Sequence, residues 1–200
     1  MSLLDNRVIG KRVCDAERPT DAAMAAPEIR CLGPQDEGEL CRILLGLEPS
    51  GRCDRFGQAA NDVYLSGYAK FALANADWIV GAFIDERLRG VVEVYNSGPH
   101  GYAEAAFVVE QEWRRRGLGW ALLRAAMEIA AQSEADRLRM IFSRHNWPMR
   151  KLAGKAGGTL DIVLDELSVD VALAEIGSQA RAGRGNDQIG IRLWHDFCDG

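Results

Sequence analysis

The chain has 200 residues, of which 48% are hydrophobic and 26% charged; this is typical of a soluble globular domain and excludes a collagen, a low-complexity chain or a mostly disordered one. The 24 Lys and Arg against 29 Asp and Glu give a formal net charge of −5, which argues against nucleic acid as a partner because phosphate recognition needs clustered positive charge. No apolar run approaches the roughly 20 residues that cross a bilayer, so we expect a cytoplasmic protein without a membrane partner.

The sequence predicts neither a disulfide framework nor a metal site. Its five cysteines are odd in number and form no CxxC pair, so free thiols in a reducing compartment are expected. Its three histidines lie far apart and show no spacing typical of metal ligands. These residues are Cys14, Cys31, Cys41, Cys53 and Cys198, and His100, His145 and His195.

A single domain is expected over residues 28–175. Residues 1–27 are polar, Ala-rich and without periodicity, which predicts a mobile leader. Residues 176–200 are Gly-rich and are expected to form a C-terminal extension, either an extra strand or a tail.

The first predicted elements are a short strand at Glu28–Leu32 and a helix at Gln35–Leu47, in which apolar residues recur at helical spacing. The turn-rich segment Glu48–Gly57 is predicted to be a loop whose charged side chains are solvated. A second helix follows, with an aromatic stripe that is typical of a core-facing surface: Tyr64, Tyr68 and Phe71.

Three strands are predicted next, at Trp78–Ile84, Arg89–Tyr95 and Tyr102–Val109. Turns at 85–88 and 96–101 separate them, so the three should form an antiparallel meander.

The pattern then changes to a helix at Leu118–Gln132 and a strand at Arg137–Ser143, a crossover that makes a parallel pair of strands. Asn146 can cap a short helix from Trp147 to about Ala156, and Thr159–Leu173 indicates one or two strands. The predicted class is α+β, with a mixed, mostly antiparallel central sheet flanked by helices on both faces.

The segment Glu112–Ala121 (EWRRRGLGWA) carries the clearest chemical signal, because a strand ends, a basic Gly-rich turn follows and a helix begins at once. The first N–H groups of a helix have no internal partner and lie at the positive end of its dipole. Gly117 and Gly119 allow backbone amides to approach an anion closely, which favours a pyrophosphate ligand. Three consecutive residues add positive charge: Arg114, Arg115 and Arg116.

Two common pyrophosphate motifs do not fit this segment. Leu122 stands where GxGxxG requires its third glycine, and no Gly-Lys-Ser/Thr of a Walker A loop follows. From these residues alone, a plain helix N-terminus with surface arginines remains an alternative.

The run from Arg114 to Gly119 matches the Arg/Gln-x-x-Gly-x-Gly/Ala signature of the GCN5-related N-acetyltransferase (GNAT) superfamily. The order of elements from about Glu28 to Leu173 also resembles that superfamily. The resemblance implies a GNAT-like fold, acetyl-CoA as cosubstrate without a metal, and transfer of an acetyl group to a primary amine by direct attack in a ternary complex.

The resemblance also implies roles in cofactor binding. Backbone amides from Arg115 to Trp120 would hold the diphosphate, and the Val109 backbone would bind pantetheine and polarise the thioester carbonyl. Asn146 would contact the pantetheine arm, and Phe107 and Val108 would line its channel. The implied set is Phe107, Val108, Val109, Arg114, Arg115, Arg116, Gly117, Leu118, Gly119, Trp120 and Asn146.

Acylation needs a neutral amine, and Glu104 is the best candidate to remove its proton. It lies in an otherwise apolar strand, where a charge is costly, and at a place where related protein acetyltransferases carry a glutamate base. If the 96–101 turn is symmetric, Glu93 lies directly opposite Glu104 on one face, where the two carboxylates would raise each other's proton affinity. The alternatives are that both face solvent, or that a slip of one residue separates them.

One departure concerns the tyrosine with which many family members reprotonate the leaving thiolate, since its place here is Ala153. This absence keeps a second hypothesis open, a non-catalytic acyl-CoA-binding regulatory module, and a third, an interaction domain without cofactor. The acceptor amine can be a protein lysine or a small amine, and dimerisation, common in the family, makes a homodimer a candidate assembly.

Overall fold

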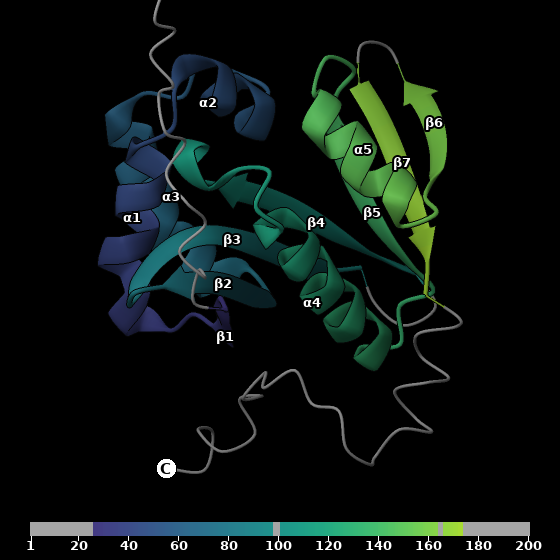
Figure 1. Ribbon diagram of the computed structural model, residues 1–200, viewed down its shortest axis with the longest axis horizontal. Helices are drawn as coiled ribbons and strands as arrows, with labels where there is room; N and C mark the ends of the chain where they lie inside the picture. The colour runs from purple at the N-terminus through teal and green to yellow at the C-terminus, as the bar shows by residue number, and fades with distance from the viewer. Residues whose placement is uncertain (1–25, 98–100, 164–165, 174–200) are drawn as a thin grey trace, which may run out of the picture.

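The computed structural model describes residues 26–97, 101–163 and 166–173 (Figure 1). At its centre lies a seven-stranded sheet of order β1-β2-β3-β4-β5-β7-β6. Every neighbouring pair in it is antiparallel except β4 and β5, which are parallel. The predicted α+β class with a mixed, mostly antiparallel sheet is therefore confirmed. Apart from residues 26 and 27, the predicted leader and the 176–200 extension lie outside the described residues.

The N-terminal half of the sheet contains β1 (Glu28–Cys31), β2 (Trp78–Ile84), β3 (Arg87–Asn96) and β4 (Tyr102–Val109). The last three form the predicted antiparallel meander. The turn from β2 to β3 has two residues rather than the predicted four, because Asp85 and Glu86 both adopt positive φ, at 50° and 60°. Turns of this type match the twist of the adjoining strands.

A short 3-10 helix, η1 (Pro34–Asp36), leads into α1 (Glu37–Leu45), and α3 (Asp62–Asn75) follows later, close to the predicted helices. The predicted loop at 48–57 is wrong, because Pro49–Phe56 forms a helix, α2. Its boundaries have local causes: Pro49 is preset for the first helical turn, and Gly57 ends the helix at a φ of 67°. Only Gly51 of this helix is buried, so no apolar periodicity marks it.

Two hydrophobic cores lie on opposite faces of the sheet. Val92 and Val94 of β3 pack in the core with α4 (Leu118–Gln132), whereas Val91 packs in the core with α1 and α3. This alternation is the period of two expected for a strand covered on both faces. The face of β3 and β4 toward α1 and α3 carries Glu93, Glu104 and Ala106. It is called the acceptor face below, after the expectation from the sequence that Glu104 deprotonates the acceptor amine.

The C-terminal half adds β5 (Arg137–Ser143), α5 (Trp147–Lys155), β6 (Thr159–Val163) and β7 (Glu166–Ala172). The parallel pairing of β4 with β5 covers only three positions, the last joining Glu104 to Arg139. Beyond it the two strands diverge, as Figure 1 shows between the labels β4 and β5. The parallel crossover is thus confirmed, and it opens the sheet along the second half of β4.

None of the helices in the described ranges has the length and apolarity that a membrane span requires. Within the same ranges, no three His, Cys, Asp or Glu side chains gather in a way that could hold a metal ion.

Candidate active site

The loop after β4 leads directly into α4 through two left-handed residues. A short 3-10 helix, η2 (Gln111–Trp113), is followed by Arg115 at a φ of 60° and Gly117 at a φ of 91°. Gly117 is the residue before α4 and meets the conformational demand that only glycine satisfies without strain. A Cβ at Gly117 would have no atom within 4 Å, and one at Gly119 would touch only Leu152 at 3.7 Å. Among the described residues, no side chain therefore covers Gly117, and only Leu152 lies near Gly119.

The loop presents open backbone donors. In the described part of the chain, the N–H groups of Arg115, Gly117, Leu118 and Gly119 have no hydrogen-bond partner. The Trp120 N–H, which was expected among the anion donors, instead donates to the Gly117 carbonyl at 3.0 Å. These open donors lie where the dipole of α4 is positive, an arrangement suited to an anion.

The backbone of β4 offers further groups where the sheet opens. Ser97 N–H donates to the Tyr102 carbonyl and Glu110 N–H to the Arg89 carbonyl, each at 3.0 Å. In an antiparallel pair, residues alternate between bonding their partner and facing away, so the even-numbered residues of β4 bond β3. The N–H and C=O groups of Phe107 and Val109 therefore point toward β5, which no longer pairs with β4 at that height.

The predicted residues of this channel thus separate into different roles. Val108 has its side chain buried in the core with α1 and α3, and its backbone faces β3. The Val109 carbonyl already accepts a hydrogen bond from a protein group, because Arg114 Nε donates to it at 3.1 Å. The groups that remain for a ligand are the Phe107 backbone and the Val109 N–H.

Asn146 lies on the other side of the opening, three residues after the end of β5. Its Oδ1 accepts the Met149 N–H at 3.2 Å, which confirms the predicted cap of α5. Ala153, at the place of the family tyrosine, is 2% exposed. No hydroxyl stands there to protonate a thiolate. His145 is exposed, and its Nε2 accepts a hydrogen bond from Arg144 at 3.1 Å.

Glu104 has a half-buried side chain on the acceptor face. Within the described ranges its carboxylate has no hydrogen bond or ion pair. The nearest cation in register is Arg139 of β5, but its guanidinium donates to both oxygens of Asp170, at 2.8 and 2.9 Å. Glu104 is therefore a carboxylate that can accept a proton or a cationic ligand.

Glu93 does not lie directly opposite Glu104, so the predicted pairing is wrong. The register places Glu93 opposite Ala106, and Tyr95 opposite Glu104. The two glutamates do share a face, as predicted, but as diagonal neighbours two positions apart. The cause is the turn, which is centred one residue later than the symmetric turn assumed over 96–101, because Ser97 still pairs with Tyr102.

Glu93 is completely buried and is the centre of a polar cluster. Its Oε2 accepts from Tyr68 at 2.6 Å and from Tyr95 at 3.1 Å, and pairs with the Arg55 guanidinium at 2.7 Å. Its Oε1 has no hydrogen-bond partner within the described part of the chain. Arg55 also donates to the Tyr68 hydroxyl at 2.8 Å, so α2, α3 and β3 meet at this cluster.

The cluster has two consequences for chemistry. The guanidinium balances the charge of Glu93, so this carboxylate serves as an anchor for α2 rather than as a free base. Burial, followed by the neighbouring Glu93, raises the pKa of Tyr68 to about 12, and both effects also raise the pKa of Tyr95. Both hydroxyls stay protonated at neutral pH and donate their hydrogen bonds to Glu93.

Sequence reasoning missed Arg55, Tyr68 and Tyr95 as site residues. Arg55 was expected to be solvated, yet its side chain is 12% exposed and stacks near the Phe56 ring. The aromatic stripe of α3 was expected to be core, but Tyr64 and Phe71 are exposed and continue from Tyr68 as a row of rings. The polar atoms of Arg55 and Tyr68 were the available signal, because a buried polar atom needs a partner.

Arginine–glutamate pairs surround the base of the loop. Arg114 Nη1 lies 2.6 Å from Glu48 Oε1, and this hydrogen bond is the main reason that the pKa of Glu48 is lowered. Glu110 pairs with Arg42 and, at 2.9 Å, with Arg89. Burial opposes ionisation of Glu110, but its two arginines outweigh that effect and lower its pKa.

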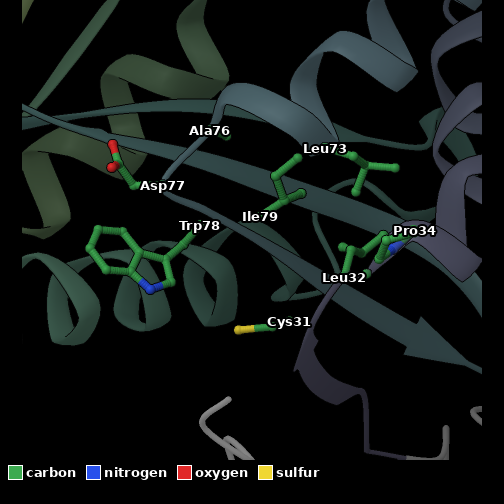
Figure 2. A pocket seen from close by; sticks show the side chains of 9 residues that line it. Cys31, Leu32, Pro34, Leu73, Ala76, Asp77, Trp78 and Ile79 are labelled. Carbon is green, nitrogen blue, oxygen red and sulfur yellow. The ribbon is translucent and has the colours of Figure 1, made fainter. Parts of the chain in front are cut away.

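A separate cavity of about 320 Å³ lies between α3, β2 and the segment after β1 (Figure 2). Its lining is mixed: Leu32, Leu73 and Ile79 contribute apolar side chains, and Asp77 contributes a carboxylate. It adjoins Trp78, which pairs with Val94 near the end of β3, whereas the loop follows the opposite end of the same ladder. The cavity is therefore distant from the loop. Burial raises the pKa of the Cys31 thiol in its lining.

Comparison with known proteins agrees with this geometry. A family model described as "Acetyltransferase (GNAT) family" matches residues 49–157, more than half of the chain. No curated protein sequence matches.

Solved structures with the same fold include three informative ones. The GNAT domain of S. lividans PAT has a TM-score of 0.65 at 18% identity, over 76% of this chain and 96% of that one. The putative acetyltransferase yncA from Salmonella typhimurium, solved with its cofactor acetyl-CoA, has a TM-score of 0.61 at 12% identity, over 74% and 95%. The PaiA N-acetyltransferase from Thermoplasma acidophilum, in complex with coenzyme A, has a TM-score of 0.59 at 18% identity, over 74% and 99%. At these identities the likeness shows a common fold.

Proposed function

Because this chain belongs to the acetyltransferase (GNAT) family, we propose that it transfers an acetyl group from acetyl-CoA to a primary amine by direct attack in a ternary complex. The single observation that carries the proposal is the open loop before α4, where the N–H groups of Arg115, Gly117, Leu118 and Gly119 have no hydrogen-bond partner among the described residues. Two similar folds were solved with acetyl-CoA or coenzyme A, which supports the same cosubstrate here.

In this proposal the loop amides and the positive end of α4 bind the diphosphate of the coenzyme. The pantetheine arm then runs along the second half of β4, where the backbone of Phe107 points toward the opening. The Val109 N–H is the proposed donor that polarises the thioester carbonyl, since a fixed backbone donor stabilises charge that develops on that oxygen. Asn146 can contribute its side-chain NH₂ from the other side, because its Oδ1 is already used by the cap.

Glu104 is the proposed base. An alkylamine is almost fully protonated at neutral pH, so a proton must leave before its nitrogen can attack. Glu104 takes that proton, the neutral nitrogen forms a bond to the carbonyl carbon, and the carbon–sulfur bond breaks to release the coenzyme thiolate. The nitrogen, which is positively charged after the attack, releases its second proton to water and leaves a neutral amide. Water supplies the proton to the thiolate, because the Ala153 position offers none.

The buried Ala153 also motivates the second candidate, a regulatory module that binds acyl-CoA without turnover. The two candidates differ in one outcome. Both predict that acetyl-CoA binds the native state and raises its melting temperature, whereas only the transferase releases coenzyme A when amines are added.

The test is a thermal-shift titration with acetyl-CoA, followed by a coenzyme A release assay with spermidine, phenethylamine and a lysine-containing peptide. Glu104→Gln should lower turnover by about 100-fold or more while leaving acetyl-CoA binding unchanged. Glu166→Gln, an exposed carboxylate of β7, is the matched control and should retain activity. Absence of a shift at millimolar acetyl-CoA would refute the cofactor assignment, and a shift without release would favour the module.

A further inference from the structure

Arg114 occupies the first position of the loop signature, but its guanidinium bonds protein groups on both sides. Nη1 donates to Glu48 at 2.6 Å, and Nε donates to the Val109 carbonyl at 3.1 Å. Glu48 is the residue that precedes the first turn of α2. The Arg114 side chain therefore links the loop by hydrogen bonds to the last residue of β4 and to the N-terminus of α2.

Helix α2 depends on polar contacts of this kind for its position. Gly51 is its only buried residue, and Phe56 at its last turn is its one side chain packed against a core, so the first turn of the helix contributes little apolar area to either core. Arg114 holds its first turn through Glu48, and its last turn is held by the pair between Arg55 and the buried Glu93. The helix itself packs against both β4 and β5, where the sheet opens.

The close fit at Gly51 supports the same arrangement. A Cβ added to Gly51 would lie 3.5 Å from Arg114 Nη2 and 3.4 Å from the Glu48 carboxyl carbon. The guanidinium thus lies directly along the first turn of α2. An arginine aimed at a diphosphate would need no contact with this helix.

We propose that Arg114 is a positioning residue, which couples the coenzyme loop to α2 so that coenzyme binding orders the helix beside the acceptor face. The inference rests on the proposed function, since it assumes that the loop binds coenzyme A. It assigns diphosphate binding to the backbone amides and removes the Arg114 side chain from that task. Acceptor and cofactor sites then communicate through one ion pair.

The competing role is a direct bond from Arg114 to the diphosphate. It predicts the opposite effect of removing Glu48 on the affinity for coenzyme A. If Arg114 bound phosphate, Glu48 would compete for the guanidinium, and its removal would strengthen coenzyme binding. If Arg114 positions the loop, removal of Glu48 weakens binding, because the loop and α2 lose their connection.

The experiment measures the dissociation constant of coenzyme A by calorimetry for the full chain, Glu48→Gln, Arg114→Gln and the double variant. We expect each single change to weaken binding by about threefold, a size typical of a partly exposed pair, and the double variant to match either single one. Tighter binding by Glu48→Gln, or a loss of tenfold or more that is confined to variants lacking Arg114, would overturn the proposal.

Hydrogen exchange of the α2 amides provides a readout that does not depend on affinity. Coenzyme A should slow exchange in Pro49–Phe56 of the wild-type protein and should leave it unchanged in both single variants. Asp54→Asn, an exposed carboxylate on the same helix, is the control and should respond as wild type does. If coenzyme A still slows hydrogen exchange of the α2 amides in Arg114→Gln, the proposed coupling is overturned. If the wild-type protein itself fails to bind coenzyme A, the proposed function fails instead.

Discussion

Gly117 provides the most direct test of the coenzyme loop, because its backbone conformation can be perturbed without steric contact. Its φ is 91°, in the left-handed region, and an added Cβ would meet nothing within 4 Å. Gly117→Ala therefore adds conformational strain and nothing else. Gly157 offers a matched control, since it has a φ of 73° and equally open surroundings at the far end of α5.

The magnitude follows from the cost of the left-handed region. A non-glycine residue there costs roughly 1–2 kcal/mol, which corresponds to about a 5- to 30-fold change in an equilibrium constant. In Gly117→Ala the unbound loop can relax away from the conformation that presents the amides. Coenzyme A must then restore that conformation, so part of the strain appears as weaker binding and the rest as lower stability.

Calorimetric titration with coenzyme A and urea unfolding measure these two parts separately. We expect Gly117→Ala to weaken binding by about tenfold with a small loss of stability, since the loop is free to relax. Gly157→Ala should lower the free energy of unfolding by a similar total and leave binding unchanged. Equal affinity of wild type and Gly117→Ala for coenzyme A would refute the assignment of the loop amides to the diphosphate.

Three further outcomes follow from the ionised and hydroxyl groups. Glu93→Ala should lower the free energy of unfolding by about 3–5 kcal/mol in urea titrations, because Arg55 would remain buried without its counter-ion; a loss below about 1 kcal/mol would contradict the anchoring role. The pKa of Tyr68 is raised from 10.0 to about 12, so its stabilising effect is complete below pH 10 and is lost as pH rises through 12; Tyr68→Phe should flatten this alkaline loss of stability. The hydrogen bond from Arg139 is the main cause that lowers the pKa of Asp170, so this pair stabilises the fold above the ordinary carboxyl pKa of 3.8 and is lost as pH falls below it; Asp170→Asn should show a smaller acid loss than wild type.

Elements with a strong apolar period were predictable from sequence, and α2 was not. The long helix Leu118–Gln132 has the predicted bounds, and nine of its residues are buried. Helix α2 buries only Gly51, so a periodicity argument has no signal to use there. Its remaining signals were the local ones at its ends, Pro49 and Gly57, which are equally typical of a turn.

The acceptor face shows where sequence reasoning stops within a correctly predicted hairpin. Glu93 and Glu104 share a face because Tyr95, the residue opposite Glu104, lies two positions from Glu93, and side chains two positions apart on a strand point the same way. Which residues stand opposite depends on the turn, and residue types alone did not determine where the turn 96–101 is centred. A shift of one residue in that centre moved Glu93 away from Glu104 and placed it opposite Ala106, within reach of Arg55.

The coenzyme loop was predictable because its anion-binding groups are backbone amides, whose exposure depends on the local sequence and not on distant contacts. Glycine at positive φ before a helix exposes amides whatever the rest of the chain does. Side chains of the same segment do not share this property. The sequence groups Arg114 with two neighbouring arginines as positive charge for a phosphate. In the structure its guanidinium bonds Glu48, which lies 66 positions earlier in the chain. A run of arginines therefore predicts the sign of the local charge, whereas the ligand of each guanidinium is decided by tertiary contacts that the run does not contain.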